Sequence, residues 1–148
     1  MVSQVTQERS VSVILFVDDN KQVRQFCKYE LGRAGYSVIL AEDGDKALRV
    51  LRRERPALVV MDLHMPRLNG LETAKLIRAQ RPDLPIVFFT SHTGYLNDER
   101  TRLGEAWVEK SEDLTELKAR MAQLLAPSQG MEDVVSGLQT GAADPDER

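Results

Sequence analysis

The chain has 148 residues, of which 42% are hydrophobic and 29% are charged, and its formal net charge at pH 7 is -3. This length predicts one domain with one sizeable core and excludes a separate catalytic or DNA-binding domain beside it. The near balance of 20 Lys and Arg against 23 Asp and Glu does not indicate a nucleic-acid binder. The polar start of the chain and the absence of a long apolar run predict no secretion signal and no membrane span, so we expect a cytoplasmic protein.

The two ends differ in composition from the middle. Residues 1–10 form a polar N-terminal extension, and residues 127–148 are rich in Pro, Gly, Ser and Asp, with five acids and one base. Such a composition predicts a disordered acidic tail, so the domain itself is expected over residues 11–126. Within the tail, residues 131–138 place apolar side chains at helical spacing; we expect this short stretch to fray, and the alternative is that it docks on a partner. The single cysteine, Cys27, excludes an internal disulfide and a zinc site built on paired cysteines.

The first part of the domain alternates strand and helix. Residues 11–17 (VSVILFV) have the continuous β-branched pattern of a strand buried on both faces of a parallel sheet. Residues 20–34 then repeat apolar side chains at helical spacing. Residues 36–41 predict a second strand. Asp43 can cap the helix that follows, which ends before the Arg55-Pro56 break.

The alternation continues to the end of the domain. Residues 57–61 (ALVVM) predict the third strand, and a loop with Pro66, Asn69 and Gly70 leads to a helix whose apolar residues are Leu71, Ala74, Leu76 and Ile77. Residues 86–89 predict a fourth strand, residues 97–103 a short helix, and residues 106–109 a fifth strand. A final helix has a stripe of leucines and a methionine, with Asp113 and Glu116 spaced as a capping box.

Five such units predict an α/β fold, with a doubly wound, five-stranded parallel sheet covered by helices on both faces. In this architecture ligands bind beyond the carboxyl ends of the strands. The residues found there are the candidates for a site: Asp18 and Asp19 after the first strand, Asp62 after the third, Thr90 after the fourth and Lys110 after the fifth.

These side chains fit one kind of chemistry. Three carboxylates at one sheet edge repel one another, and a hard divalent cation such as Mg²⁺ would relieve the repulsion. With Asp62 as nucleophile, Lys110 as counter-charge and Thr90 as hydroxyl donor, the set suits phosphoryl transfer to an aspartate. Water would later hydrolyse the acyl phosphate, so the site would act as a timed switch.

The motifs that carry these residues resemble the receiver domain of bacterial two-component response regulators, across residues 11–126. FVDDN contains the acidic pair Asp18 and Asp19, and VVMDLHMPRLNG contains the phosphoacceptor Asp62. PIVFFTS supplies the hydroxyl of Thr90, and WVEKS supplies Lys110. The resemblance implies the five-stranded flavodoxin-like receiver fold.

The resemblance also implies ligands and partners. Mg²⁺ would be bound by Asp19, Asp62 and the main-chain carbonyl of His64, with Asp18 acting through water. A sensor histidine kinase or phosphotransfer protein would donate the phosphoryl group. Thr90 and the aromatic Trp107 would then reshape the face made by the fourth helix, fifth strand and fifth helix, for an unidentified protein target or a homodimer.

The organisation of the chain further limits what the resemblance implies. No output domain follows residue 126, which indicates a stand-alone receiver with neither direct DNA binding nor membrane contact. It would be a phosphoacceptor that dephosphorylates itself rather than a turnover enzyme. Ser111 stands where the family usually has proline, and the polar segment between residues 90 and 110 is slightly short for the family. Trp107 has a second interpretation as a half-exposed strand aromatic.

His64 and His92 each lie two residues beyond a site residue. They are candidates for tuning the lifetime of phosphorylated Asp62, and the alternative is that both are loop residues facing solvent.

Three other functions compete with the switch. A phosphatase of the haloacid-dehalogenase type also uses an aspartate nucleophile, but it needs a second aspartate where this chain has His64. A flavodoxin-like cofactor protein needs a phosphate-cradling first loop, and the acidic DDNK would repel phosphate. A degenerate receiver could act as an interaction module without phosphorylation, yet all five site residues are intact.

Overall fold

The computed structural model describes residues 11–91 and 102–126. Five parallel strands form one sheet in the order β2-β1-β3-β4-β5. The strands are β1 (Val13–Val17), β2 (Ser37–Ala41), β3 (Leu58–Met61), β4 (Ile86–Thr90) and β5 (Ala106–Glu109). The helices are α2 (Lys21–Arg33), α3 (Gly44–Leu51), α4 (Gly70–Gln80) and α5 (Thr115–Leu125). The predicted α/β fold is confirmed.

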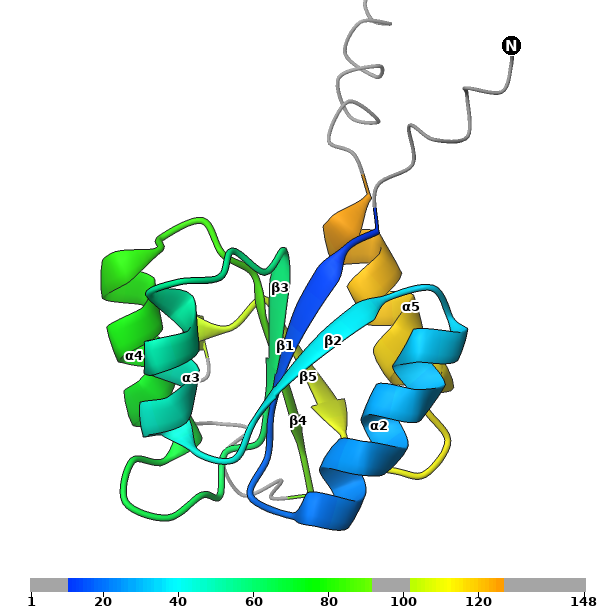
Figure 1. Cartoon of the computed structure of the whole chain (residues 1–148), viewed down its shortest axis with the longest axis horizontal. Coiled ribbons are helices and arrows are strands. Elements are labelled where there is room, and N and C mark those ends of the chain that lie inside the picture. Colours follow the sequence, from blue (N-terminus) through cyan, green and yellow to red (C-terminus); the bar gives the residue numbers. More distant parts are fainter. Residues whose placement is uncertain (1–10, 92–101, 127–148) are drawn as a thin grey trace, which may run out of the picture.

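The helices cover both faces of the sheet. Figure 1 shows α3 and α4 on one side and α2 and α5 on the other. From β1 the chain first moves to β2 at one edge of the sheet, and it then crosses back to β3, β4 and β5 on the other side of β1. Right-handed crossovers in both directions produce such a doubly wound sheet. This places the carboxyl ends of β1 and β3 side by side in the middle of the sheet, where a site can form.

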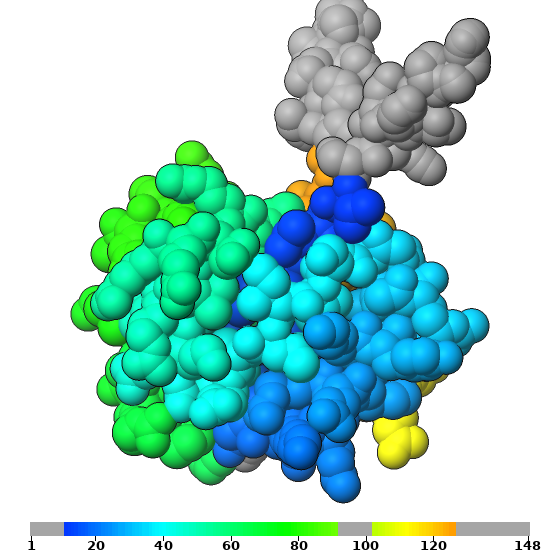
Figure 2. All heavy atoms as spheres, in the orientation of Figure 1, coloured from blue at the N-terminus to red at the C-terminus, as the bar shows by residue number. Residues whose placement is uncertain are grey.

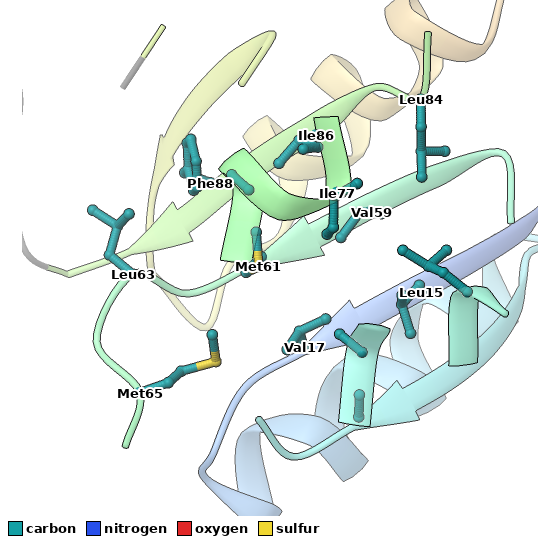
Figure 3. Close-up of a cluster of buried hydrophobic side chains, with 14 of the residues drawn as sticks. Leu15, Val17, Val59, Met61, Leu63, Met65, Ile77, Leu84, Ile86 and Phe88 are labelled. Atoms are coloured by element: carbon teal, nitrogen blue, oxygen red, sulfur yellow. The ribbon is translucent and has the colours of Figure 1, made fainter. Parts of the chain in front are cut away.

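Two apolar clusters, one on each face, hold the layers together. The cluster under α3 and α4 is drawn in Figure 3, where Leu15, Val59 and Phe88 project from three neighbouring strands. The second cluster contains Phe16 of β1, which makes an edge contact with Phe89 of β4 at a centroid distance of 6.3 Å. Because the central strands are buried on both faces, their sequences are continuously apolar rather than alternating.

Side-chain caps fix where three helices begin. Asn20 accepts a hydrogen bond from the main-chain N–H of Val23, and Asp43 accepts one from that of Lys46. Asn69 and Glu72 form a full capping box at the start of α4. These caps satisfy N–H groups that would otherwise have no partner, so each helix starts just beyond the sheet edge that carries the candidate site.

Some sequence predictions about the helices were wrong. The predicted capping box of Asp113 and Glu116 does not form, because α5 has Leu114 at its N-cap and no side-chain cap. Asp113 instead accepts hydrogen bonds from the N–H and hydroxyl of Thr115, which makes a local turn. Leu76, expected in the buried stripe of α4, is 43% exposed, because Leu71, Ala74 and Ile77 already fill the contact with the sheet.

Several predicted segments lie outside the described residues. They are the N-terminal extension at residues 1–10, most of the short helix predicted at residues 97–103, and the acidic tail at residues 127–148. Within the described part of the chain, no helix is long and apolar enough to cross a bilayer. In the space-filling view the described residues form a rounded body, with α2 at its surface (Figure 2).

Candidate functional site

The candidate residues meet at the carboxyl edge of the sheet. Asp18 directly follows β1, Asp62 follows β3 and Lys110 follows β5, while Thr90 is the last residue of β4. Main-chain hydrogen bonds continue the sheet beyond these strand ends: the N–H of Asp62 donates to the carbonyl of Val17 at 3.1 Å, and that of Lys110 to the carbonyl of Thr90 at 2.9 Å. The sheet register therefore sets the positions of these residues.

Lys110 bridges two buried carboxylates. Its Nζ lies 2.7 Å from Oδ2 of Asp18 and 2.8 Å from Oδ2 of Asp62. Asp18 is 1% exposed and Asp62 is 5% exposed, so both charges lie in a medium that screens weakly. One ammonium thus neutralises only part of the charge of two carboxylates.

The pKa values of Asp18 and Lys110 are both raised in this arrangement, but for different reasons. Burial raises the pKa of Asp18 above its usual value, and the hydrogen bond from Lys110 opposes this only in part. Burial alone would lower the pKa of Lys110, but its hydrogen bonds to Asp18 and Asp62 outweigh that effect and the pKa is raised. Lys110 is therefore firmly charged, whereas ionised Asp18 costs free energy.

The carboxylates also form a possible metal site. Oxygens of Asp18, Asp19 and Asp62 all lie within 4.8 Å of one another, and Asp19 is exposed while the other two are buried. This oxygen-only donor set, open to solvent on one side, fits Mg²⁺, which prefers oxygen ligands and retains several waters.

The loop after β3 is held close to Asp62. The N–H of His64 donates to Oδ1 of Asp62 at 3.3 Å, while the His64 side chain is exposed. The N–H of Gly70 donates to the carbonyl of Leu63 at 2.8 Å. A Cβ on Gly70 would lie 2.3 Å from the carbonyl oxygen of Asp62, so only glycine permits this approach. The sequence placed Gly70 in a loop but did not predict this contact.

A second contact was missed altogether. Arg67, with a positive φ of 65°, directs its Nη2 to Oδ2 of Asp43 at 2.5 Å, and its Nε lies 3.6 Å from Oδ2 of Asp45. The sequence predicts only a helix cap for Asp43, a role that it also has. The ion pair ties the loop after β3 to the start of α3. The position of Asp43 at the end of the second strand was the available signal, but nothing in the sequence paired it with Arg67.

The remaining candidates lie around this centre. Thr90 is fully buried. The Trp107 ring is half-buried and tilted by 56° against Phe88, with 5.7 Å between ring centroids, which agrees with its interpretation as a half-exposed strand aromatic in this structure. Ser111 is exposed, and its hydroxyl accepts a hydrogen bond from the N–H of Asp113. His92 lies outside the described residues.

Known proteins are similar to this chain in sequence. Residues 14–122 match the family model for the response regulator receiver domain. The chain is 37% identical to the response regulator MprA of Mycobacterium leprae over 139 residues, and 41% identical to that of Mycolicibacterium vanbaalenii over 116 residues. These alignments cover 89% and 76% of this chain but only 60% and 49% of the relatives, so the chain spans roughly half their length.

Solved structures give the same fold. The response regulator TrrA of Thermotoga maritima, in complex with Mg²⁺-BeF, is 35% identical with a TM-score of 0.76, and the match covers 78% of this chain and all of TrrA. TrrA bound to the histidine kinase ThkA gives a TM-score of 0.74 at 34% identity with the same coverage. CheY4 of Vibrio cholerae is 28% identical with a TM-score of 0.72 and again the same coverage. With a flavodoxin-like sheet, an acidic edge and a family match over residues 14–122, this chain belongs to the response regulator receiver domain family.

Proposed function

We propose that the chain is a phosphoacceptor switch in a two-component phosphorelay and that Asp62 receives the phosphoryl group. The observation that carries this proposal is the buried contact of Asp62 with Lys110, in reach of the Asp18 and Asp19 carboxylates. A carboxylate held beside an ammonium at an open sheet edge can receive a phosphoryl group, whose added negative charge the ammonium and a bound cation would neutralise together.

The transfer step conserves the phosphoryl group. A carboxylate oxygen of Asp62 attacks the phosphorus of the donor, a P–O bond to Asp62 forms, and the bond from phosphorus to the donor's nitrogen or oxygen breaks. Lys110 neutralises oxygens of the transferred group, and the hydroxyl of Thr90 donates to it. In the reverse half of the cycle water attacks phosphorus, which releases inorganic phosphate and restores the Asp62 carboxylate.

Asp19, Asp62 and the main-chain carbonyl of His64 would hold Mg²⁺ directly, with Asp18 helping through water. When bound, the ion supplies charge neutralisation for the carboxylates and for the transferred phosphoryl oxygens. The TrrA complex with Mg²⁺-BeF supports this assignment, since TrrA shares the fold at 35% identity.

The switch would act through partner binding. The TrrA complex with its histidine kinase supports a sensor kinase, or a phosphotransfer protein, as the donor. Thr90 and Trp107 would couple phosphorylation to the face that includes β5 and α5, where a protein target or a second copy would bind. The division into a receiver domain at residues 11–126 and an acidic tail at residues 127–148 belongs to the same proposal.

Incubation of the full chain with acetyl phosphate and Mg²⁺, followed by intact mass spectrometry, tests the assignment. We expect one phosphoryl adduct that needs the metal and that Asp62→Asn lacks. The matched control is Asp83→Asn, which removes an exposed carboxylate between α4 and β4 and should leave the adduct unchanged. No adduct on the parent chain would instead assign the domain as an interaction module that works without phosphorylation.

The two histidines carry a smaller part of the proposal. If their rings border the phosphoryl group, His64→Ala and His92→Ala should each change the lifetime of the adduct at fixed pH and Mg²⁺. Lifetimes equal to that of the parent would leave both as solvent-facing loop residues.

A further inference from the structure

The outer face of α2 carries an unusual patch, which we call the α2 hollow. It is a shallow depression of about 520 Å³ lined by Gln25, Lys28, Tyr29, Gly32 and Arg33. Tyr29 is 65% exposed, and Phe26 one turn away is 41% exposed. Two neighbouring aromatic side chains on one helix face, beside a depression, form an apolar surface that no described element covers.

Gly32 deepens the hollow, although no contact within the described structure requires glycine there. A Cβ on Gly32 would have no heavy atom within 4 Å, and the residue lies inside α2 without a positive φ. Glycine within a helix is about 0.5–1 kcal/mol less favourable than alanine. This cost would be offset if a further segment packed closely against the helix backbone at Gly32.

The rim of the hollow is basic. Lys28 and Arg33 flank the aromatic ring, and the Arg33 guanidinium lies 5.9 Å from the centroid of Tyr29. Along α2 the only acid is Glu30, which pairs with Arg33 at 3.6 Å. The matching occupant would therefore present apolar side chains flanked by acidic ones.

The chain itself contains such a segment. Residues 131–138 (MEDVVSGL) place Met131, Val134, Val135 and Leu138 at helical spacing, with Glu132 and Asp133 beside them. We propose that residues 131–138 dock in the α2 hollow of the same molecule, with their apolar stripe on Tyr29 and Phe26 and their acids toward Lys28 and Arg33.

The position of α5 is compatible with this docking. α2 and α5 pack on the same face of the sheet, and the described chain ends at Ala126, just past α5 (Figure 1). The four residues that link Ala126 to Met131 span at most about 18 Å, and the 13 residues of α2 are about 20 Å long. A tether this short keeps the segment at roughly millimolar effective concentration, so even a weak contact would be populated.

Disulfide trapping in the full chain tests the docking. In the variant Gln25→Cys/Val135→Cys, which leaves Gly32 in place at the hollow, mild oxidation with diamide should form an intramolecular disulfide about tenfold faster than in Lys75→Cys/Val135→Cys. Lys75 is the control site because it is exposed on α4, on the other face of the sheet. Native Cys27 interferes little, since it is 1% exposed and burial raises its pKa to about 12. Peptide mapping identifies each disulfide, and gel filtration separates monomer from dimer.

Substitutions in the segment provide the second arm. Adding Val134→Asp/Leu138→Asp to the trapping variant should lower its rate to that of the Lys75 control, while Ala142→Asp/Ala143→Asp adds the same charge outside the apolar stripe and should not. Adding Tyr29→Ala should also slow trapping severalfold. Equal rates for the two cysteine pairs, or no effect of the stripe substitutions, would overturn the proposal. Disulfides found only between molecules would assign the hollow to a second copy and overturn it as well.

Discussion

The interior of the sheet and its carboxyl edge differ in what their buried side chains contribute. Inside, Phe88 and its neighbours are apolar, fully buried and packed against α3 and α4 (Figure 3). At the edge, Asp18 and Asp62 are buried to nearly the same extent but share a single ammonium, that of Lys110. Burial of apolar side chains thus stabilises the fold in the interior, whereas burial of the two carboxylates destabilises it at the edge.

This difference indicates that the proposed phosphorylation chemistry would take place at the carboxyl edge of the sheet. The raised pKa of Asp18 means that its charged form is less stable in the folded protein than in water. In the proposed switch, this unfavourable negative charge would help to bind a cation. Truncating a buried apolar side chain should therefore lower stability, whereas neutralising the buried Asp18 carboxylate should raise it.

The largest effect is expected in the interior. Phe88→Ala should lower the free energy of unfolding by about 3–5 kcal/mol, because it leaves a cavity under α4 and removes the ring contact with Trp107. Urea unfolding at pH 7 measures the change. Val11→Ala, at a 59% exposed position, is the control and should have almost no effect. A loss below about 1 kcal/mol for Phe88→Ala would mean that the core repacks freely.

Removing the ammonium that bridges the two buried carboxylates should come next. Lys110→Met leaves two buried carboxylates facing each other, and we expect a loss of about 2–3 kcal/mol at pH 7. The loss should shrink as the pH falls to about 4, because one carboxyl group then takes up a proton. Urea unfolding at both pH values checks this. A loss that does not change with pH would mean that it comes from the lost packing of the Lys110 side chain.

Two glycine substitutions compare the sheet edge with the surface of α2. Gly70→Ala puts a methyl group 2.3 Å from the Asp62 carbonyl and should cost about 2 kcal/mol. Gly32→Ala, where no heavy atom of the described residues lies within 4 Å of the added methyl group, should instead gain about 0.5–1 kcal/mol, less any docking contact that the methyl group displaces. Thermal unfolding of the two variants gives the comparison, and similar melting temperatures would contradict it.

The smallest effect has the opposite sign. Asp18→Asn should raise the free energy of unfolding by about 1 kcal/mol at pH 7, since it removes the buried charge that burial disfavours. Because the folded pKa of Asp18 lies above the unfolded value of 3.8, the parent loses stability as the pH rises through that window. The advantage of the variant should therefore be present at neutral pH and vanish below pH 3.8. Unfolding curves from pH 3 to pH 7 test the sign, and a destabilised variant at pH 7 would show that the Lys110 pair outweighs burial.

Much of this could be predicted from the sequence, because it depends on local patterns and one topological rule. Continuous apolar runs marked the central strands, and 3.6-residue spacing marked the helices. Since carboxyl ends of parallel strands meet at one edge, Asp18, Asp62, Thr90 and Lys110 could be brought together without coordinates. Their roles in phosphorylation remain predictions.

Only the tertiary structure decided how these side chains pair. Lys110 contacts Asp18 as well as Asp62, Arg67 contacts Asp43, and Gly70 lies against the Asp62 backbone. The capping box formed at Asn69 and Glu72 rather than at Asp113 and Glu116. The physical reason is that strand and helix formation follow short periodic patterns, whereas contacts between loops depend on the register of strands far apart in the chain and on which partner burial leaves within reach.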